Sequence, residues 1–217
     1  MFFHKHPYEP FIQENTQKLI VGTLPPPRFT TGELLEKDVN FCYGSYYNSL
    51  WLFIDKIHNL NLRFDNSQEA VEQRKQFLIQ QKIGVCDIVA SAERDKIDAS
   101  DLGMKNIKLR DVIGYIKTYP RIETILFTGG NSKNGPEYFF RRHIRTYNLK
   151  LELVNDEVPR IHKFNLGNRS IKTVSLTSGS GAANISISRL PVYKHMKAKN
   201  PEFNTFDFRV MQYSEYL

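Results

Sequence analysis

Four short apolar runs, separated by longer segments of helical periodicity, most constrain the fold of this 217-residue chain. The runs cover residues 19–21, 83–89, 124–127 and 171–176, and the first three are apolar almost throughout. Continuous apolar runs of this length are typical of strands that are buried on both faces of a parallel sheet. Strands that alternate with helices predict an α/β fold. We therefore expect a three-layer α/β/α sandwich with a short, mainly parallel four-stranded central sheet, and residues 1–217 forming a single domain.

The helical segments carry their own boundary signals. Residues 66–80 open with an Asn66/Glu69 capping pair, and Asn106 is a candidate cap for a helix that ends before Pro120. Pro136 suits the first turn of a helix that extends to residue 147. We expect an extended piece in residues 152–164 and, from residue 201 onward, a segment with a helix start near Asn204 and Asp207 that packs on the core.

Composition excludes several classes of protein. The two cysteines form no C-x-x-C pair, and the six histidines form no i, i+4 pair, so neither a disulfide framework nor a metal site is expected. The apolar runs are too short to span a bilayer, and the N-terminus lacks a secretory pattern, so we expect a cytoplasmic protein with a solvated terminus around His4 and His6. The net charge of +7 favours an anionic partner.

Glycine- and serine-rich segments follow the predicted strands. They cover residues 22–27, 128–132 and 177–184, while residues 90–94 follow the second strand. Ligands of parallel α/β sheets bind beyond the carboxyl ends of the strands, and glycine-rich turns with free backbone N–H groups bind phosphate. These segments match neither a dinucleotide-binding fingerprint nor a Walker loop. The sequence therefore predicts a ligand site at this edge.

One stretch between the first two strands carries a family resemblance. Residues 40–51 read NFCYGSYYNSLW, and residues 22–25 read GTLP. Together they resemble the uracil-DNA glycosylase superfamily, and most closely its hypoxanthine-DNA glycosylase-like branch. Residues 86–94, 126–129 and 176–182 are similar to further motifs of that branch in the same order. Leu24 stands where other branches have Asn or Asp, which this branch lacks. The sequence departs from the family pattern at Ser45-Tyr46, at Thr128 and in residues 176–182, where two prolines are absent.

The resemblance implies a monofunctional DNA glycosylase, which flips a deaminated base, uracil or hypoxanthine, out of damaged duplex or single-stranded DNA and hydrolyses its N-glycosidic bond. It implies a monomer without a metal or organic cofactor. The catalytic candidate is Asn48. The candidate substrate-binding residues are Tyr43, Gly22, Thr23, Leu24, Pro25, Thr128 and Asn131, and the candidate phosphate-binding residues are Ser178, Gly179, Ser180 and Gly181.

Structural roles compete with these assignments. Tyr43 is either a stacking platform or a core aromatic, and Asn48 either positions water or caps the helix that begins at residue 49. Asp87 either activates water or pairs with an arginine such as Arg94, and we favour the pairing. Trp51, Phe53 and Ile54 are expected in the core. The basic residues 141, 142 and 145 either form a solvated helix face or border the cleft.

Two other functions remain open from sequence alone. The first is a nucleic-acid-binding module that has kept the cleft without catalysis, because Leu24 and Ser45-Tyr46 replace family residues. The second is an enzyme that acts on free nucleosides or nucleotides, because the same serine and glycine turns can bind a lone phosphate.

Overall fold

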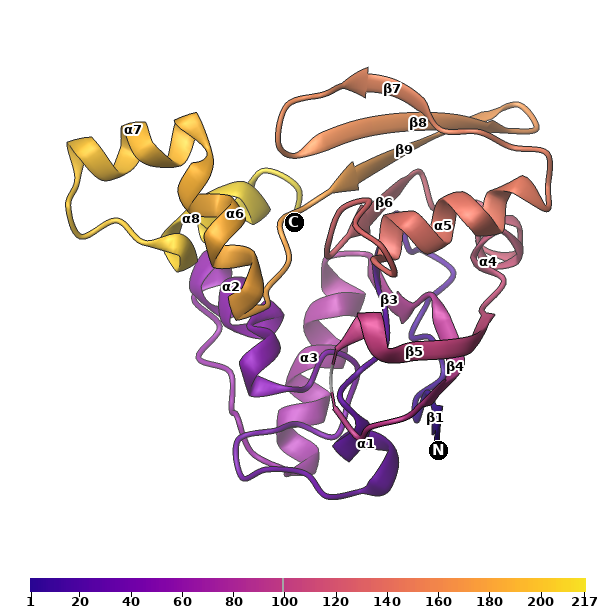
Figure 1. Cartoon of the computed structure of the whole chain (residues 1–217), viewed down its shortest axis with the longest axis horizontal. Helices are drawn as coiled ribbons and strands as arrows, with labels where there is room; N and C mark the ends of the chain where they lie inside the picture. Colours follow the sequence, from indigo (N-terminus) through magenta and orange to yellow (C-terminus); the bar gives the residue numbers. More distant parts are fainter. Residues whose placement is uncertain (99) are drawn as a thin grey trace.

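A six-stranded mixed sheet forms the centre of the fold in the computed structural model, which describes residues 1–98 and 100–217. Four neighbouring strands run parallel, in the order β3 (Ile83–Asp87), β2 (Lys18–Gly22), β6 (Thr124–Phe127) and β9 (Arg169–Ser175). A hairpin of β8 (Arg160–Leu166) and β7 (Glu152–Asn155) extends the sheet in antiparallel orientation (Figure 1). The α/β class is confirmed, but the expected four-stranded sheet is wrong by two strands.

A second sheet of three antiparallel strands was not expected. Its order is β1 (Phe2–Lys5), β4 (Val89–Arg94) and β5 (Met104–Leu109). The run predicted as one strand over residues 83–89 is therefore divided, because β3 ends at Asp87 and Val89 begins β4 in the other sheet. Residues 90–94 were expected as a ligand-binding segment and instead form most of β4.

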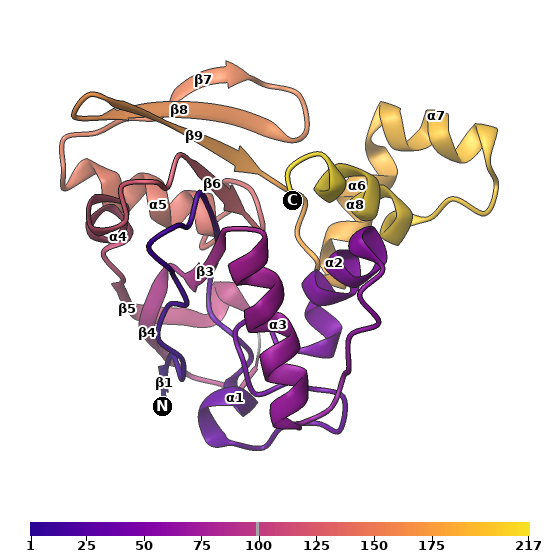
Figure 2. The same cartoon turned by 180° about the vertical axis from the view of Figure 1, so that it is seen from behind.

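Helices cover both faces of the central sheet. On one face, α2 (Leu50–His58), α3 (Gln68–Gln80) and α8 (Thr205–Ser214) pack in a cluster that contains Ile20 of β2. On the other face, α4 (Val112–Thr118) and α5 (Pro136–Arg145) pack in a cluster that contains Leu19 and Val21. Figures 1 and 2 show α5 and α3 on opposite sides of the sheet. This double burial explains the continuous apolar strands. Trp51, Phe53 and Ile54 are in the core as predicted.

Two helix starts differ from the predictions. Ser67, and not Asn66, caps α3, because its hydroxyl accepts a hydrogen bond from the Ala70 amide at 3.2 Å. Asn106 lies in β5 with a φ of 47°, and α4 begins after Asp111, whose carboxylate accepts a bond from the Gly114 amide. Before α3, two adjacent polar residues can each act as the cap. The error at Asn106 has another cause, because residues 104–109 pair with β4 and the helix begins only after them.

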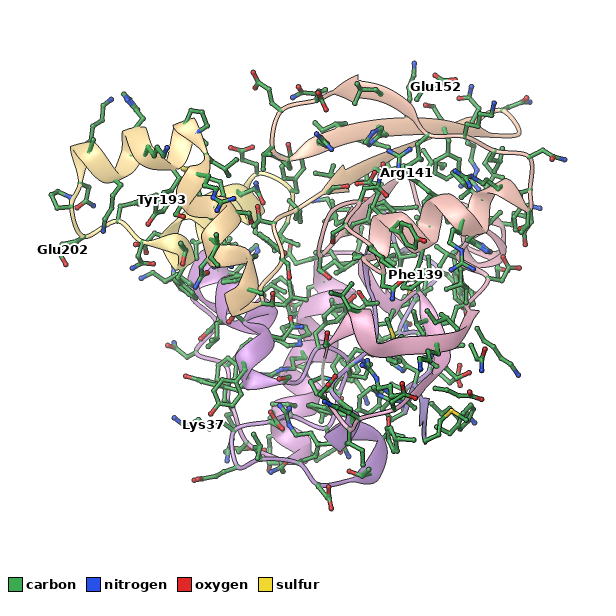
Figure 3. All side chains as sticks on the ribbon, viewed as in Figure 1. Lys37, Phe139, Arg141, Glu152, Tyr193 and Glu202 are labelled. Atoms are coloured by element: carbon green, nitrogen blue, oxygen red, sulfur yellow. The ribbon has the colours of Figure 1, made fainter. Side chains whose placement is uncertain are left out.

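The remaining elements are short. They are α1 (Pro27–Thr31), η1 (Tyr46–Asn48), η2 (Asp101–Gly103), η3 (Gly181–Ala183), α6 (Asn184–Arg189) and α7 (Pro191–Lys199). Helices α6 and α7 lie with α8 at one side of the molecule, where Tyr193 packs against Phe203 and Phe208 (Figures 1 and 3). Within the described residues, no helix is long and apolar enough to cross a membrane.

The predicted basic helix face is partly internal. Arg141 extends from α5 toward β8, where its guanidinium binds the buried carboxylate of Glu137 at 2.7 Å and lies 2.9 Å from His162 (Figure 3). The other Glu137 oxygen accepts a bond from the Ser175 hydroxyl at 2.6 Å. Arg141 therefore ties α5 to the sheet rather than lying on a solvated face.

Candidate functional site

A cavity opens at the edge where the parallel strands end. The strand register places Gly22 beside Asp87 and Val21 beside Phe127, so the loops that follow these strands start side by side. The cavity has a volume of about 550 Å³. Among its lining residues are the predicted site residues Gly22, Thr23, Leu24, Pro25, Tyr43, Asn48, Thr128, Ser178 and Ser180.

Asn131 lies apart from these residues. It lines a neighbouring hollow of about 480 Å³, which shares Thr23, Thr128, Ser178 and Ser180 with the first cavity. Neither hollow is lined by Gly179 or Gly181, which lie between the lining serines and Ala182. Nine of the twelve predicted residues therefore line the first cavity, and Asn131, Gly179 and Gly181 do not.

Tyr43 forms part of the cavity wall in a fixed orientation. Its backbone has a φ of 58°, and its hydroxyl donates a hydrogen bond to the Cys86 carbonyl at 2.8 Å. Burial, with a smaller contribution from the charge of Asp87, raises the pKa of Tyr43 well above its usual value, so the phenol stays neutral. The ring is a rigid, uncharged surface against which a flat ligand can pack.

Gly22 leaves room for the groups around it. A Cβ at this position would lie 2.5 Å from Oδ1 of Asp87 and 2.8 Å from the Tyr43 hydroxyl oxygen. Because both distances are shorter than any normal contact, only glycine fits without displacing the carboxylate and the phenol. The glycine in the first motif is therefore required by the close approach of Tyr43 and Asp87.

Asn48 presents an unbonded amide to the cavity. It ends the turn η1, and α2 starts two residues later, with Ser49 (φ 67°) and not Asn48 at the N-cap. The alternative prediction, a capping role for Asn48, is therefore wrong. Within residues 1–98 and 100–217, no protein group forms a hydrogen bond with the Asn48 side chain. This amide is free to bind a ligand or water in the cavity.

The turn after β9 touches Asn48 directly. A Cβ on Gly179 would lie 1.9 Å from the Asn48 carbonyl oxygen, so the two backbones are in contact. Helix α8 holds the turn from behind, because Arg209 donates to the carbonyls of Ser178 and Ser180 at 2.8 and 3.0 Å. From the sequence we expected a packing element there, and the structure shows in addition that α8 holds this turn.

Asp87 lies in the cavity with a partner that the sequence did not indicate. Nε2 of His6 lies 2.9 Å from Oδ2 of Asp87, and Nδ1 of His6 accepts a hydrogen bond from the Tyr8 amide at 3.1 Å. The proton of the ring therefore sits on Nε2 and points at the carboxylate. The predicted pairing with Arg94 is wrong, because the Arg94 guanidinium binds Nδ1 of His4 at 2.8 Å.

The N-terminal histidines are buried rather than solvated. Strand β1 pairs with β4, and this places His4 opposite Ala92 with none of its surface exposed. Burial, followed by the nearby charge of Arg94, lowers the pKa of His4 to about 4. In the described part of the chain, no group of three or more histidine, cysteine or acidic residues could hold a metal ion.

Folding stability should depend on pH through His4. The folded state keeps its imidazole neutral down to pH values near 4, whereas in the unfolded chain the pKa is about 6.5. The contribution of the neutral His4 side chain to folding stability is therefore complete above pH 6.5 and is lost as the pH falls toward 4. It amounts to about 3 kcal/mol in the free energy of unfolding. Urea denaturation at pH 7 and pH 4.5 measures it. We expect the free energy of unfolding to differ less between pH 7 and pH 4.5 in His4→Asn than in the wild type. An equal difference in both proteins would contradict this role of His4.

The fold of the chain resembles that of a solved structure. No family model and no curated protein matches the chain. A structural match is the solution NMR structure of a "putative Uracil DNA glycosylase" from Methanosarcina acetivorans, with a TM-score of 0.56 over 99% of this chain and 96% of that one. The chain has a uracil-DNA-glycosylase-like fold. At 17% sequence identity, the likeness concerns the fold alone.

Proposed function

We propose that this chain is a monofunctional DNA glycosylase, which hydrolyses the N-glycosidic bond of uracil or hypoxanthine after the nucleotide has rotated out of its strand. The observation that carries the proposal is the shared cavity, because Tyr43, Asn48 and Asp87 line one hollow together with Ser178 and Ser180 of the turn. A volume of about 550 Å³ suits a small ligand. The motif resemblance to the hypoxanthine-DNA glycosylase-like branch supports the same function.

Asp87 and Tyr43 would bind the base. A carboxylate oxygen accepts hydrogen bonds and donates none. The ring nitrogen that accepts in cytosine and adenine carries a hydrogen in uracil and hypoxanthine, because deamination changes the ring to its keto form. The carboxylate of Asp87 can therefore accept a bond from the deaminated base, while the Tyr43 ring packs against its face. Thr128 lies at the border of both hollows and can bind an edge of the base.

Asn48 would act at the sugar. A neutral amide is no strong base, but its oxygen can orient a water molecule toward C1′. Its N–H group can stabilise charge that develops as the bond to the base breaks. Among the described residues that line the cavity there is no lysine to form a Schiff base, and we propose direct hydrolysis. The reaction is then a single displacement by water.

The turn at residues 178–181 would bind the DNA strand. Its serine hydroxyls and backbone amides lie at the cavity edge, where the phosphates beside a flipped nucleotide would pass. Arg209 and the Tyr213 hydroxyl hold this turn through the carbonyls of residues 177, 178 and 180. Because these carbonyls already accept bonds from α8, the turn is fixed before a ligand arrives.

A lesion panel tests the proposed function. The protein is incubated with duplexes that each carry one uracil, hypoxanthine or xanthine, and abasic sites are then cleaved with alkali. We expect scission at the uracil or hypoxanthine position and none in the undamaged duplex. DNA binding without release from any lesion would contradict the proposal and favour a binding module without catalysis.

A further inference from the structure

The guanidinium of Arg28 has no role in the function described so far. Arg28 lies in α1, immediately after the prolines at residues 25–27, and its side chain is 22% exposed. Among the described residues that line the cavity, it is the one with a cationic side chain. This positive charge can bind an anionic group of a ligand in the cavity.

A buried carboxylate fixes the orientation of Arg28. Its Nε and Nη2 donate to the two oxygens of Asp38 at 2.6 and 2.9 Å, and Nη2 also donates to the Ser45 hydroxyl at 2.8 Å. Asp38 is fully buried and accepts further bonds from the amides of Leu35 and Tyr46. Burial opposes ionisation of Asp38, but the bonds from Arg28 and these amides hold its pKa below the usual value. The guanidinium is thus held in place by an ionised partner.

The other edge of the guanidinium is open. In the described part of the chain, every hydrogen bond of the Arg28 guanidinium uses Nε or Nη2, which leaves the two N–H groups of Nη1 without a protein acceptor. An arginine side chain that is held on one edge and open on the other is suited to an anionic oxygen. Ser45 and Tyr46, which contact the Arg28–Asp38 pair, lie between Tyr43 and Asn48 in the sequence. The orientation of Arg28 is therefore coupled to the site.

We propose that Arg28 binds a phosphate ester at the mouth of the cavity, an inference that rests on the proposed function. Asp87 and Tyr43 are both buried and suit the base, whereas Arg28 is partly exposed and shares the cavity wall with Tyr47, whose surface is 71% exposed. The group that meets Arg28 is then the part of the nucleotide nearest solvent. That part is the phosphate of the flipped nucleotide.

Salt-dependent binding tests the contact. The probe is a duplex with one 2′-fluoro-2′-deoxyuridine, which resists hydrolysis, and its affinity is measured at several salt concentrations. Loss of one phosphate contact lowers the slope of log K against log salt by about 0.9. We expect this change in Arg28→Met. In the matched control Arg63→Met, which removes an exposed arginine paired with Asp65 away from the cavity, the slope should not change.

A second variant separates binding from folding. Because Arg28→Met leaves the Asp38 carboxylate buried without its partner, the double variant Arg28→Met/Asp38→Asn is measured as well, with the unfolding midpoint of each protein. The same slope change in a folded double variant supports the contact. An unchanged slope in the folded double variant, with affinity lowered equally at all salt concentrations, would overturn a contact with the phosphate of DNA.

A nucleotide arm identifies the source of the phosphate. The affinities for deoxyuridine 5′-monophosphate and for deoxyuridine are compared in wild type and in Arg28→Met. A loss confined to the monophosphate, without any change in the duplex slope, would support the contact and assign it to a free nucleotide, against the proposed function. No change with either probe would overturn the contact, while release of uracil by the wild type in the lesion panel would still support the glycosylase.

Discussion

Replacing Asn48 with alanine should slow release of the base by about 10²–10³-fold, the loss that follows removal of one hydrogen-bond donor to a transition state. The side chain of Asn48 lines the cavity, and no group of the described chain forms a hydrogen bond with its amide. Its removal should therefore affect the reaction far more than folding. Single-turnover release from the lesion duplex that the wild type cleaves measures the effect.

The control for Asn48→Ala is Asn165→Ala. Asn165 is an exposed asparagine in β8 and lines neither hollow, so its removal should leave the rate unchanged. The unfolding midpoints of both variants should stay close to that of the wild type. If Asn48→Ala releases the base at the wild-type rate, the assignment of Asn48 as the catalytic residue is wrong, and another residue of the cavity must carry the reaction.

Replacing Gly179 with alanine should disrupt the site from the opposite side. The new Cβ would lie 1.9 Å from the Asn48 carbonyl oxygen, which belongs to the backbone and cannot rotate away. Either the turn or η1 must move, and we expect a loss of about 1–3 kcal/mol in the free energy of unfolding. Because the movement also displaces Asn48, we expect base release to slow by at least about 10-fold.

Gly181→Ala is a matched control for Gly179→Ala. Gly181 lies two residues further along the same turn, and no atom lies within 4 Å of the Cβ that alanine would add. Both the stability and the rate should therefore match the wild type. Equal effects of the two substitutions would show that general stiffness of the turn matters, and not its contact with Asn48.

Strands β2, β3 and β6 could be predicted because nearly all of their residues are buried, and their composition shows this directly. Strand β9 has exposed residues in its first half, and its β-branched residues identified it. Strand β7 gives no such signal, since all four of its residues are exposed. The division between β3 and β4 is also hidden, because Asp87, Ile88 and Val89 are all buried and no exposed turn residue marks the break. What ends β3 there is pairing of β4 with β1 and β5, which depends on residues far away in the sequence.

The site was predictable where it follows the strand ends. The segments that carry Gly22, Thr128 and Ser178 meet because they lie at the ends of β2, β6 and β9, which are parallel and end at one edge. Tyr43 and Asn48 follow no strand, and the motif resemblance indicated them. The partner of Asp87 could not be predicted, because His6 is 81 residues away and arrives through β1 of the second sheet. The support of the turn by Arg209 depends likewise on tertiary packing of α8.

The most direct test is to map where the lesion binds. Backbone amide chemical shifts are recorded while a duplex with one 2′-fluoro-2′-deoxyuridine is added, and an undamaged duplex serves as the reference. The account predicts that shifts specific to the lesion concentrate in residues 22–25, 43–48, 87 and 177–182. Lesion-specific shifts confined to the β7–β8 hairpin or to α7, with the cavity residues unchanged, would contradict it.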